Sequence, residues 1–433
     1  MIIKNILKKG TFASNVAILS SGSVLGQLIV FLISPVLTRV FQAEAFANLA
    51  VVVSIYSIIG SIVTLRYEMA IPLVKDERDC NALIVLNFLL ALALISIISI
   101  IFFLFKEPIS LILKLRMNKY IIYILPLSIF FEALRNIFRF VYIRSENYKA
   151  LSLSAVIRSS SISTFQLFFG FVIAMKKLGL IFGHIIGQMF ELLWLVFKYF
   201  KKGWAEFLKN ISFSRMLYNA KKYKNFPIYS SWNILLNKLS LNLPVLLLVT
   251  FYPKELVGLY ALSIRVLNTP FNILGNSIGQ VYYQQISKYL RNNIKITKFV
   301  ITTSLKLFII VLFPLLVIKF WGEEIFMFVF GNEWSESGKV ASLLVPLYLT
   351  RLTVSPISSI FAATNKQYVS LIWQFIYLAG IFMCLYLPRG SIQFFEMVNI
   401  FSLVVTLLYI ILFLFVIIVV KLADRKITRD GTI

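Results

Sequence analysis

Two uncharged apolar runs constrain this chain most strongly. Leu83 to Phe105 is 23 residues long and Leu403 to Val420 is 18 residues long, and neither contains a charged side chain. About 20 apolar residues in helical form match the hydrocarbon thickness of a bilayer. Within lipid only helices and closed barrels satisfy the backbone, and barrel strands alternate polar with apolar residues, which these runs do not. The runs therefore predict an all-α polytopic membrane protein.

The rest of the sequence repeats this pattern. It is 59% hydrophobic and 14% charged, against about 45–50% and about 25% in soluble domains. Apolar runs interrupted by charge clusters and by Pro or Gly predict twelve transmembrane helices. We expect them at residues 13–37, 46–65, 83–105, 120–143, 152–175, 179–200, 226–250, 257–284, 299–320, 340–362, 368–388 and 393–420. Twelve spans place both termini on the same side of the membrane.

The basic residues indicate which side that is. With the N-terminus in the cytoplasm, 26 of the 43 Lys and Arg residues fall in inside segments, 11 fall outside and 6 fall within spans. Cytoplasmic segments of membrane proteins carry such an excess of Lys and Arg. We therefore expect both termini in the cytoplasm, and we attribute the net charge of +25 to membrane sidedness instead of nucleic-acid binding.

One long basic connection divides the chain. It predicts an N-terminal six-helix lobe at 1–205, a basic cytoplasmic linker at 206–225 and a C-terminal six-helix lobe at 226–433. A weak internal repeat at an offset of 210 aligns residues 41–50 with residues 251–260, which suggests a pseudo-twofold relation between the lobes. Internal repeats of this kind are typical of transporters whose substrate site lies where the repeats meet.

Charged side chains also occur where lipid would exclude them. Six basic residues fall inside predicted spans: Arg135, Arg158, Lys238, Arg265, Lys306 and Arg351. Each would cost about 2.5–3.5 kcal/mol at the centre of the bilayer, so such residues usually face a bundle interior or a water-filled cavity. Only three acidic residues accompany them: Glu132, Glu191 and, near a span edge, Glu396. This surplus of positive charge predicts a hydrated cavity whose counter-charge arrives with an anionic substrate.

Arginine suits a phosphate or diphosphate because its planar fork binds oxygens in pairs. We therefore predict that Arg135, Lys238, Arg265 and Arg351 bind substrate, and that Glu132 and Glu191 act as charge partners or coupling sites. Two alternatives stay open at this point. Glu132 lies three residues before Arg135 on one helix and can neutralise it locally, and Arg158 and Lys306 can snorkel to the cytoplasmic interface.

Other chemistries find little support in the sequence. It has no GxxxxGK[ST] loop for ATP, and no connection exceeds about 30 residues, which leaves no room for a soluble catalytic domain. Cys80, Cys384 and His184 have no partner spacing and are interpreted as packing residues, without a metal or other cofactor. A membrane polymerase would need a larger external loop than the one expected at 321–339. A glycosyltransferase would need an acidic metal-binding motif, whereas Asp76 and Asp79 are interpreted as ordinary juxtamembrane charge.

Several segments resemble one known family. The segment from Leu65 to Asp76 reads LRYEMAIPLVKD and is similar to the stretch after the second span of bacterial polysaccharide flippases. Gly258 to Pro270 (GLYALSIRVLNTP) and the LGNSIGQV that begins at Leu274 resemble the same proteins. The chain is thus identified as a member of the multidrug/oligosaccharidyl-lipid/polysaccharide exporter superfamily, in its O-antigen or capsule flippase branch.

The resemblance has several implications. It implies an undecaprenyl-diphosphate-linked oligosaccharide as the substrate, a coupling ion such as H⁺ or Na⁺, and an inner bacterial membrane shared with other polysaccharide-assembly proteins. Arg39 resembles the arginine that ends the first span in this branch, and Arg265 resembles an arginine of the eighth span that lines the central cavity. The acidic cation site of the drug-exporting relatives is absent from the first span, which argues against a multidrug antiporter. A flippase for lipid II or for a teichoic-type precursor remains an alternative.

Overall fold

The computed structural model describes residues 12–112, 120–201, 203–204, 207, 211–364 and 366–430, and all regular structure in these ranges is helical. Twelve of the helices are long. They are α2 (Phe12–Val40), α3 (Ala43–Gly60), α4 (Glu77–Leu104), α6 (Tyr120–Arg144), α7 (Tyr148–Phe171), α8 (Gly179–Phe200), α11 (Ser231–Phe251), α12 (Lys254–Arg291), α13 (Thr297–Phe330), α14 (Ser335–Val354), α16 (Gln367–Tyr386) and α17 (Phe394–Asp430). The predicted all-α polytopic fold class with about twelve long helices is confirmed.

Ten regions of the described chain are long and apolar enough to cross a membrane by length and composition. The two long helices without such a region are α7 and α12, which carry more polar residues. Short elements occupy the connections: η1 (Tyr67–Leu73), α5 (Lys106–Ile112), α10 (Phe213–Lys222), η3 (Phe226–Ser230), η4 (Asn332–Trp334), η5 (Pro356–Ser359) and α15 (Ile360–Ala363).

Two boundaries differ from the sequence-based prediction. The second span ends at Gly60 instead of residue 65, because the chain turns there and enters η1. The external loop expected at 321–339 is mostly helical. Helix α13 continues to Phe330 across a non-helical residue at Trp321, and α14 starts at Ser335. Gly331 has a φ of 108°, a conformation that glycine adopts without steric cost, and it ends α13.

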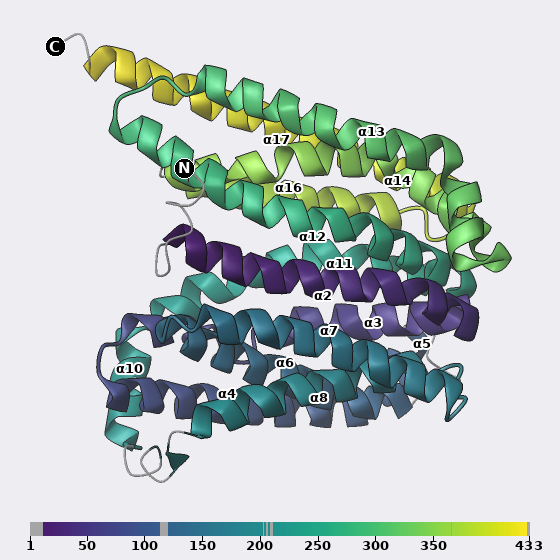
Figure 1. Ribbon diagram of the computed structural model, residues 1–433, viewed down its shortest axis with the longest axis horizontal. Coiled ribbons are helices and arrows are strands. Elements are labelled where there is room, and N and C mark those ends of the chain that lie inside the picture. Colours follow the sequence, from purple (N-terminus) through teal and green to yellow (C-terminus); the bar gives the residue numbers. More distant parts are fainter. Residues whose placement is uncertain are drawn as a thin grey trace. The chain divides into compact units, whose positions relative to one another are not determined.

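The chain forms two compact units, Met1–Thr250 and Phe251–Ile433, here called unit 1 and unit 2. Within each unit the long helices run alongside one another (Figure 1). The predicted linker at 206–225 lies inside unit 1, and part of it falls outside the described residues. The predicted division into six plus six helices around this linker remains a prediction.

Tight helix packing organises unit 1 around α7. Helix α2 approaches α7 at Gly22, and α8 approaches it at Gly183 and Gly187. A Cβ atom on Gly187 would lie 2.5 Å from the backbone of Ile162. Glycine lets helix backbones come this close in membrane proteins. The result is a three-helix layer that holds the middle of α7 against α8.

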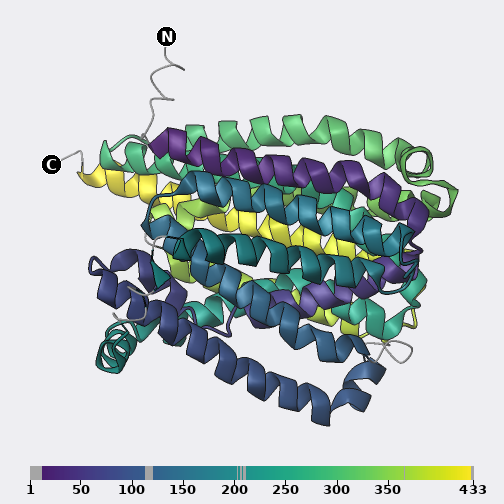
Figure 2. The same ribbon diagram turned by 60° about the horizontal axis from the view of Figure 1, so that its bottom comes forward.

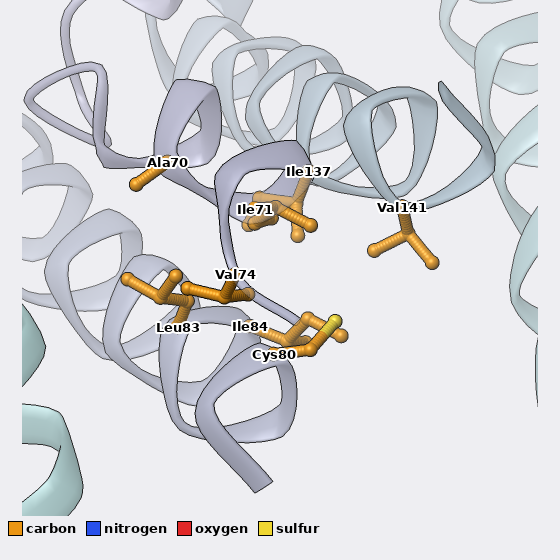
Figure 3. Close-up of a cluster of buried hydrophobic side chains, with 8 residues drawn as sticks. All are labelled: Ala70, Ile71, Val74, Cys80, Leu83, Ile84, Ile137 and Val141. Carbon is orange, nitrogen blue, oxygen red and sulfur yellow. The ribbon is translucent and has the colours of Figure 1, made fainter. Parts of the chain in front are cut away.

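An apolar cluster of unit 1 joins η1 to the start of α4 and to the C-terminal part of α6. Figure 3 shows its buried side chains, which come from η1 and its edge, α4 and α6: Ala70, Ile71, Val74, Cys80, Leu83, Ile84, Ile137 and Val141. Burial of such apolar side chains contributes about 1.5–3 kcal/mol for each large one. This cluster fixes the connection between α3 and α4 at one end of the unit.

Unit 2 has its own close contacts. Gly322 of α13 meets Gly338 of α14, where a Cβ on Gly338 would lie 2.1 Å from the Gly322 carbonyl oxygen. The end of α17 also holds the start of α13. The Asp424 carboxylate accepts hydrogen bonds from the Ile296 and Thr297 backbone N–H groups at 2.8 and 3.1 Å. These bonds satisfy donors that the first turn of a helix leaves without partners.

Candidate functional site

Unit 1 contains a buried cluster of four charges on three neighbouring helices. Glu132 and Arg135 belong to α6, Arg158 to α7 and Glu191 to α8. Arg135 donates from Nε to Glu132 Oε2 at 3.0 Å and from Nη2 to Glu132 Oε1. Arg158 lies between the two acids, with Nη2 3.5 Å from Glu132 Oε2 and Nε 3.7 Å from Glu191 Oε2. The two arginines and two glutamates balance, so this cluster is neutral by its own residues.

Glu191 is the least satisfied member of this cluster. Its side chain is 3% exposed, and its Oε2 atom has no hydrogen-bond partner among the residues that the structure describes. The distance of 3.7 Å to Arg158 is an ion-pair distance but is too long for a hydrogen bond. A buried carboxylate oxygen without a hydrogen bond is a costly arrangement. This oxygen is therefore an acceptor whose hydrogen-bonding capacity the described residues leave unused.

A polar group from α3 and α8 adjoins the charges. The Tyr56 hydroxyl lies 2.8 Å from His184 Nε2, and Gln188 Nε2 lies 3.3 Å from the same ring atom. Gly60, one turn after Tyr56 on α3, leaves room for Glu132, because a Cβ there would lie 3.3 Å from Glu132 Cγ. Tyr56 also interacts with Arg158. Helix α3 therefore completes the polar interior of unit 1.

Lys238 extends the positive charge of unit 1. It lies in α11, half-buried, and Glu132 is the acid whose charge acts on it. No carboxylate of the described residues lies within 4 Å of its ammonium group. Lys238 thus adds a positive charge to a cluster that is already neutral without it.

Unit 2 differs because its two half-buried arginines lack acidic neighbours in the sequence. Arg265 is on α12 and Arg351 is on α14. The sequence has no Asp or Glu from residue 256 to 322, or from 337 to 395. No carboxylate of the described residues lies within 4 Å of the Arg265 guanidinium. The charge of Arg265 is therefore not neutralised by a carboxylate of its own unit.

Tyrosines surround the Arg351 side chain. Its guanidinium carbon lies 5.8 Å from the centre of the Tyr348 ring, which is within cation–π range. Tyr260, Tyr377 and Tyr409 lie near enough to this side chain for electrostatic interaction. Ring faces stabilise a cation without cancelling its charge. Tyr348 is therefore a stabilising neighbour of the Arg351 guanidinium in unit 2.

Two other basic residues are exposed. Arg39 lies in the last turn of α2, where the helix C-terminus favours a cation. Lys306 lies on α13 with an exposed side chain, as the snorkelling alternative expects. For Arg158 that alternative is wrong, because the structure pairs it with Glu132 and Glu191. The predicted local pair of Glu132 and Arg135 is confirmed.

Sequence reasoning missed three members of the polar interior. Tyr56 was not singled out, Arg158 was left out of the predicted site, and His184 was interpreted as incidental. A usable signal exists in α8, where His184, Gln188 and Glu191 follow one another at spacings of four and three. Such spacings place side chains on one helix face. A polar stripe on an apolar helix would have pointed to this interior.

The segment LRYE forms a strained turn at one end of unit 1. Leu65 and Arg66 both have positive φ, at 50° and 62°, which is uncommon for residues other than glycine. Glu68 is buried, accepts a hydrogen bond from the Thr64 hydroxyl at 2.6 Å and pairs with Arg66 at 3.1 Å. Burial raises the pKa of Glu68, while the charge of Arg66 opposes that rise. The turn is therefore held by a specific polar network.

Comparison with known proteins shows the family and the fold of this chain. A family model described as "Polysaccharide biosynthesis protein" matches residues 36–339. No curated protein matches the sequence. Among solved structures, an inward-facing multidrug resistance MATE family transporter of the MOP superfamily aligns with a TM-score of 0.70 and 12% identity, covering 94% of each chain.

Two further structures share this fold. The lipid II flippase MurJ in an inward closed conformation has a TM-score of 0.70 and 13% identity, covering 94% of this chain and 89% of that one. A MOP superfamily transporter from Pyrococcus furiosus has a TM-score of 0.56 and 13% identity, covering 95% and 96%. The matched family model shows that the chain belongs to the polysaccharide biosynthesis protein family, and the structural likenesses show that it shares the fold of the MOP superfamily transporters and of the lipid II flippase.

Proposed function

We propose that this protein is a flippase that moves an undecaprenyl-diphosphate-linked oligosaccharide from the cytoplasmic to the periplasmic leaflet of a bacterial inner membrane. Membership of a polysaccharide biosynthesis family supports a saccharide cargo. The lipid II flippase of the same fold supports a lipid-linked one. The repeat unit of an O-antigen or a capsule is the cargo that fits both.

One observation carries the anionic part of this proposal. Arg135 and Arg158 of unit 1 are neutralised by Glu132 and Glu191, whereas Arg265 of unit 2 has no carboxylate of the described residues within 4 Å. A buried charge that the protein does not neutralise is costly. A diphosphate would supply the missing negative charge. The unneutralised charge then destabilises the protein without its cargo, because the site has to stay able to bind an anion.

The chemistry of the individual residues fits this role. Guanidinium groups bind phosphate oxygens in pairs, which suits Arg265 and Arg351 of unit 2 to a diphosphate. Arg39, Arg135 and Lys238 of unit 1 are the other cationic residues of the proposal. The lipid tail stays in the bilayer while the protein alternates between states open to either side of the membrane. Positive charge helps the cargo to enter but opposes its release, so binding has to stay weak enough to reverse.

Release therefore needs a second influence, and we assign it to unit 1. Glu191 offers a buried oxygen without a hydrogen bond, next to an arginine that it shares with Glu132. A proton or Na⁺ bound there would change the charge of the cluster from neutral to positive. Such a change would alter how Arg158 is held between α6 and α8. Glu132 and Glu191 are thus the proposed coupling residues.

The test is complementation of a deletion strain, scored for surface polysaccharide at matched protein levels in the membrane. We expect Arg265→Gln and Arg351→Gln to reduce export strongly. Lys306→Gln serves as the matched control, because this basic residue of unit 2 is exposed and its loss should leave export unchanged. Full export by both arginine variants would refute the cationic role.

The identity of the cargo needs a separate measurement. Mass spectrometry of the lipid fraction of the deletion strain should show a single undecaprenyl-diphosphate oligosaccharide that accumulates and that disappears on complementation. Accumulation of lipid II, or of a teichoic-type precursor, would replace the oligosaccharide by that cargo. Accumulation of an incomplete or unpolymerised chain at the periplasmic leaflet would indicate a transferase or polymerase instead.

A further inference from the structure

Helix α10 differs from the other helices of unit 1 in its direction. Ser212 caps its start, and the helix runs from Phe213 to Lys222. It crosses the ends of the unit's long helices instead of running beside them (Figures 1 and 2). Because those helices span the bilayer, α10 lies along the membrane surface.

The inner face of α10 is attached to unit 1 by named polar contacts. Arg215 Nη1 lies 2.7 Å from Asp76 Oδ2 and 3.1 Å from Asp79 Oδ1, both at the start of α4. Asn219 donates to Asp79 at 3.2 Å. The Tyr67 hydroxyl donates to the carbonyl oxygen of Ala220 at 2.9 Å. These contacts fix both the depth of α10 and the direction in which its other face points.

That depth is the level of the lipid headgroups. Asp79 of α4 binds Arg215 of α10. The apolar run of α4 starts four residues later, at Leu83. At a rise of about 1.5 Å per residue the separation is about 6 Å along the helix axis. Headgroup regions occupy roughly the outer 5–8 Å on each side of the hydrocarbon core. The side chains of α10 can therefore reach both the headgroups and the start of the acyl chains.

The outer face of α10 is apolar and basic. Phe213, Leu217 and Tyr218 are 69%, 56% and 59% exposed, and Lys221 and Lys222 are exposed beside them. The sequence contains no Asp or Glu from residue 207 to 254. Large apolar side chains flanked by lysines are typical of helices that lie in the membrane interface. The cytoplasmic leaflet, where the basic connections of this chain are expected, carries anionic lipids.

We propose that α10 is a docking surface for anionic phospholipids. Phe213 and Leu217 insert at the boundary between headgroups and acyl chains, and Lys221 and Lys222 bind lipid phosphates. The lipid thereby clamps the segment that precedes α11 to the membrane surface. This inference concerns the linker only, and it holds whatever cargo the protein carries.

Hydrogen–deuterium exchange on the full-length protein in nanodiscs tests the proposal. Amides of α10 should exchange several-fold more slowly in phosphatidylcholine mixed with phosphatidylglycerol than in phosphatidylcholine alone. The double variant Lys221→Gln/Lys222→Gln should lose this difference. A Lys288→Gln variant, which alters an exposed lysine of unit 2, should keep it. Equal exchange of the unaltered protein in the two lipids would overturn the proposal.

A spin label provides a second readout on the same face. Leu217→Cys is labelled in a chain whose Cys80 and Cys384 are replaced by Ala, and Asn293→Cys at an exposed turn is the reference for aqueous exposure. Collision with dissolved oxygen should exceed collision with a water-soluble nickel complex at Leu217 and not at Asn293. Aqueous behaviour at Leu217 would contradict lipid docking. Protection from both reagents would contradict it too, because a protein partner would then cover the face.

Discussion

The charge cluster of unit 1 allows a direct test of how the fold tolerates buried arginines. Glu132 accepts two hydrogen bonds from Arg135 and lies 3.5 Å from Arg158. Glu132→Gln keeps the shape of the side chain and removes its charge, so the four-residue cluster changes from neutral to a net charge of +1. Arg135 and Arg158 would then repel each other with only Glu191 to compensate.

The expected magnitude follows from burial. Glu132 and Arg135 have side chains that are only 14% and 18% exposed. Removing one partner of a buried pair costs about 3–5 kcal/mol, and the remaining exposure favours the lower end, about 3 kcal/mol. At about 2–4 °C per kcal/mol for a folded unit of this size, thermal unfolding in nanodiscs should begin about 6–12 °C lower.

Two further variants decide whether charge is the cause. Glu132→Gln/Arg135→Gln restores neutrality and should recover a large part of the lost stability. Glu77→Gln breaks a surface pair with Arg144 in which the glutamate is 70% exposed, so it should cost less than about 1 kcal/mol. If the double variant were no more stable than Glu132→Gln alone, lost packing would explain the effect and the reasoning from charge would fail.

Four other predictions follow from single contacts. Gly187→Leu should lower the free energy of unfolding by about 3 kcal/mol, because a Cβ there would lie 2.5 Å from the α7 backbone. Gly279→Ala is the control in the same thermal-unfolding assay. It should be tolerated, because its Cβ would lie 3.7 Å from the nearest atom. Asp424→Ala removes the acceptors at the start of α13, so it should cost about 1–2 kcal/mol and speed deuterium exchange in that turn. Hydrogen bonds from the Arg78 backbone N–H and from the Arg215 side chain lower the pKa of Asp76. A lowered pKa stabilises the docked α10 above the unfolded pKa of about 3.9. The protection factors of α10, which compare its exchange with the intrinsic rate at the same pH, should therefore fall as the pH drops below that value, and in Asp76→Asn they should be lower already at neutral pH. Arg265→Met should raise the unfolding temperature, because it removes a half-buried charge with no carboxylate of the described residues within 4 Å, while export falls. A lower unfolding temperature would show that the guanidinium is a structural group.

Helix positions could be predicted closely from the sequence, because apolar length and charge breaks are direct consequences of the bilayer. The helix ends were less predictable where local geometry decides them. The turn after Gly60 depends on positive φ at Leu65 and Arg66, which no hydropathy pattern reports. The continuation of α13 to Phe330 depends on packing between Gly322 and Gly338. Tertiary contacts of this kind override the composition of a short segment.

The candidate site was predictable in its residue types but not in its pairing. A sequence shows that Arg135, Arg158 and Glu191 are in spans, but only the fold shows that α7 brings Arg158 between two acids on α6 and α8. The local pair of Glu132 and Arg135 was accessible because it lies within one helix turn. Pairing across helices depends on rotation of each helix about its axis, which the close glycine contacts of α7 with α2 and α8 determine.

The different charge balance of the two units bears on how an anion can be moved instead of merely bound. If all buried arginines lacked carboxylates, a diphosphate would be held too tightly to leave. If all were paired, nothing would favour its entry. Unit 1 pairs Arg135 and Arg158 internally, and Arg265 in unit 2 has no carboxylate of the described residues within 4 Å. A proton or cation on Glu191 would shift unit 1 toward positive charge without touching Arg265, so cargo affinity and coupling can change independently. The Arg265 and Glu132 variants therefore test whether these two roles are separate. Arg265→Met should lose export while its unfolding temperature rises, whereas Glu132→Gln should first lose stability.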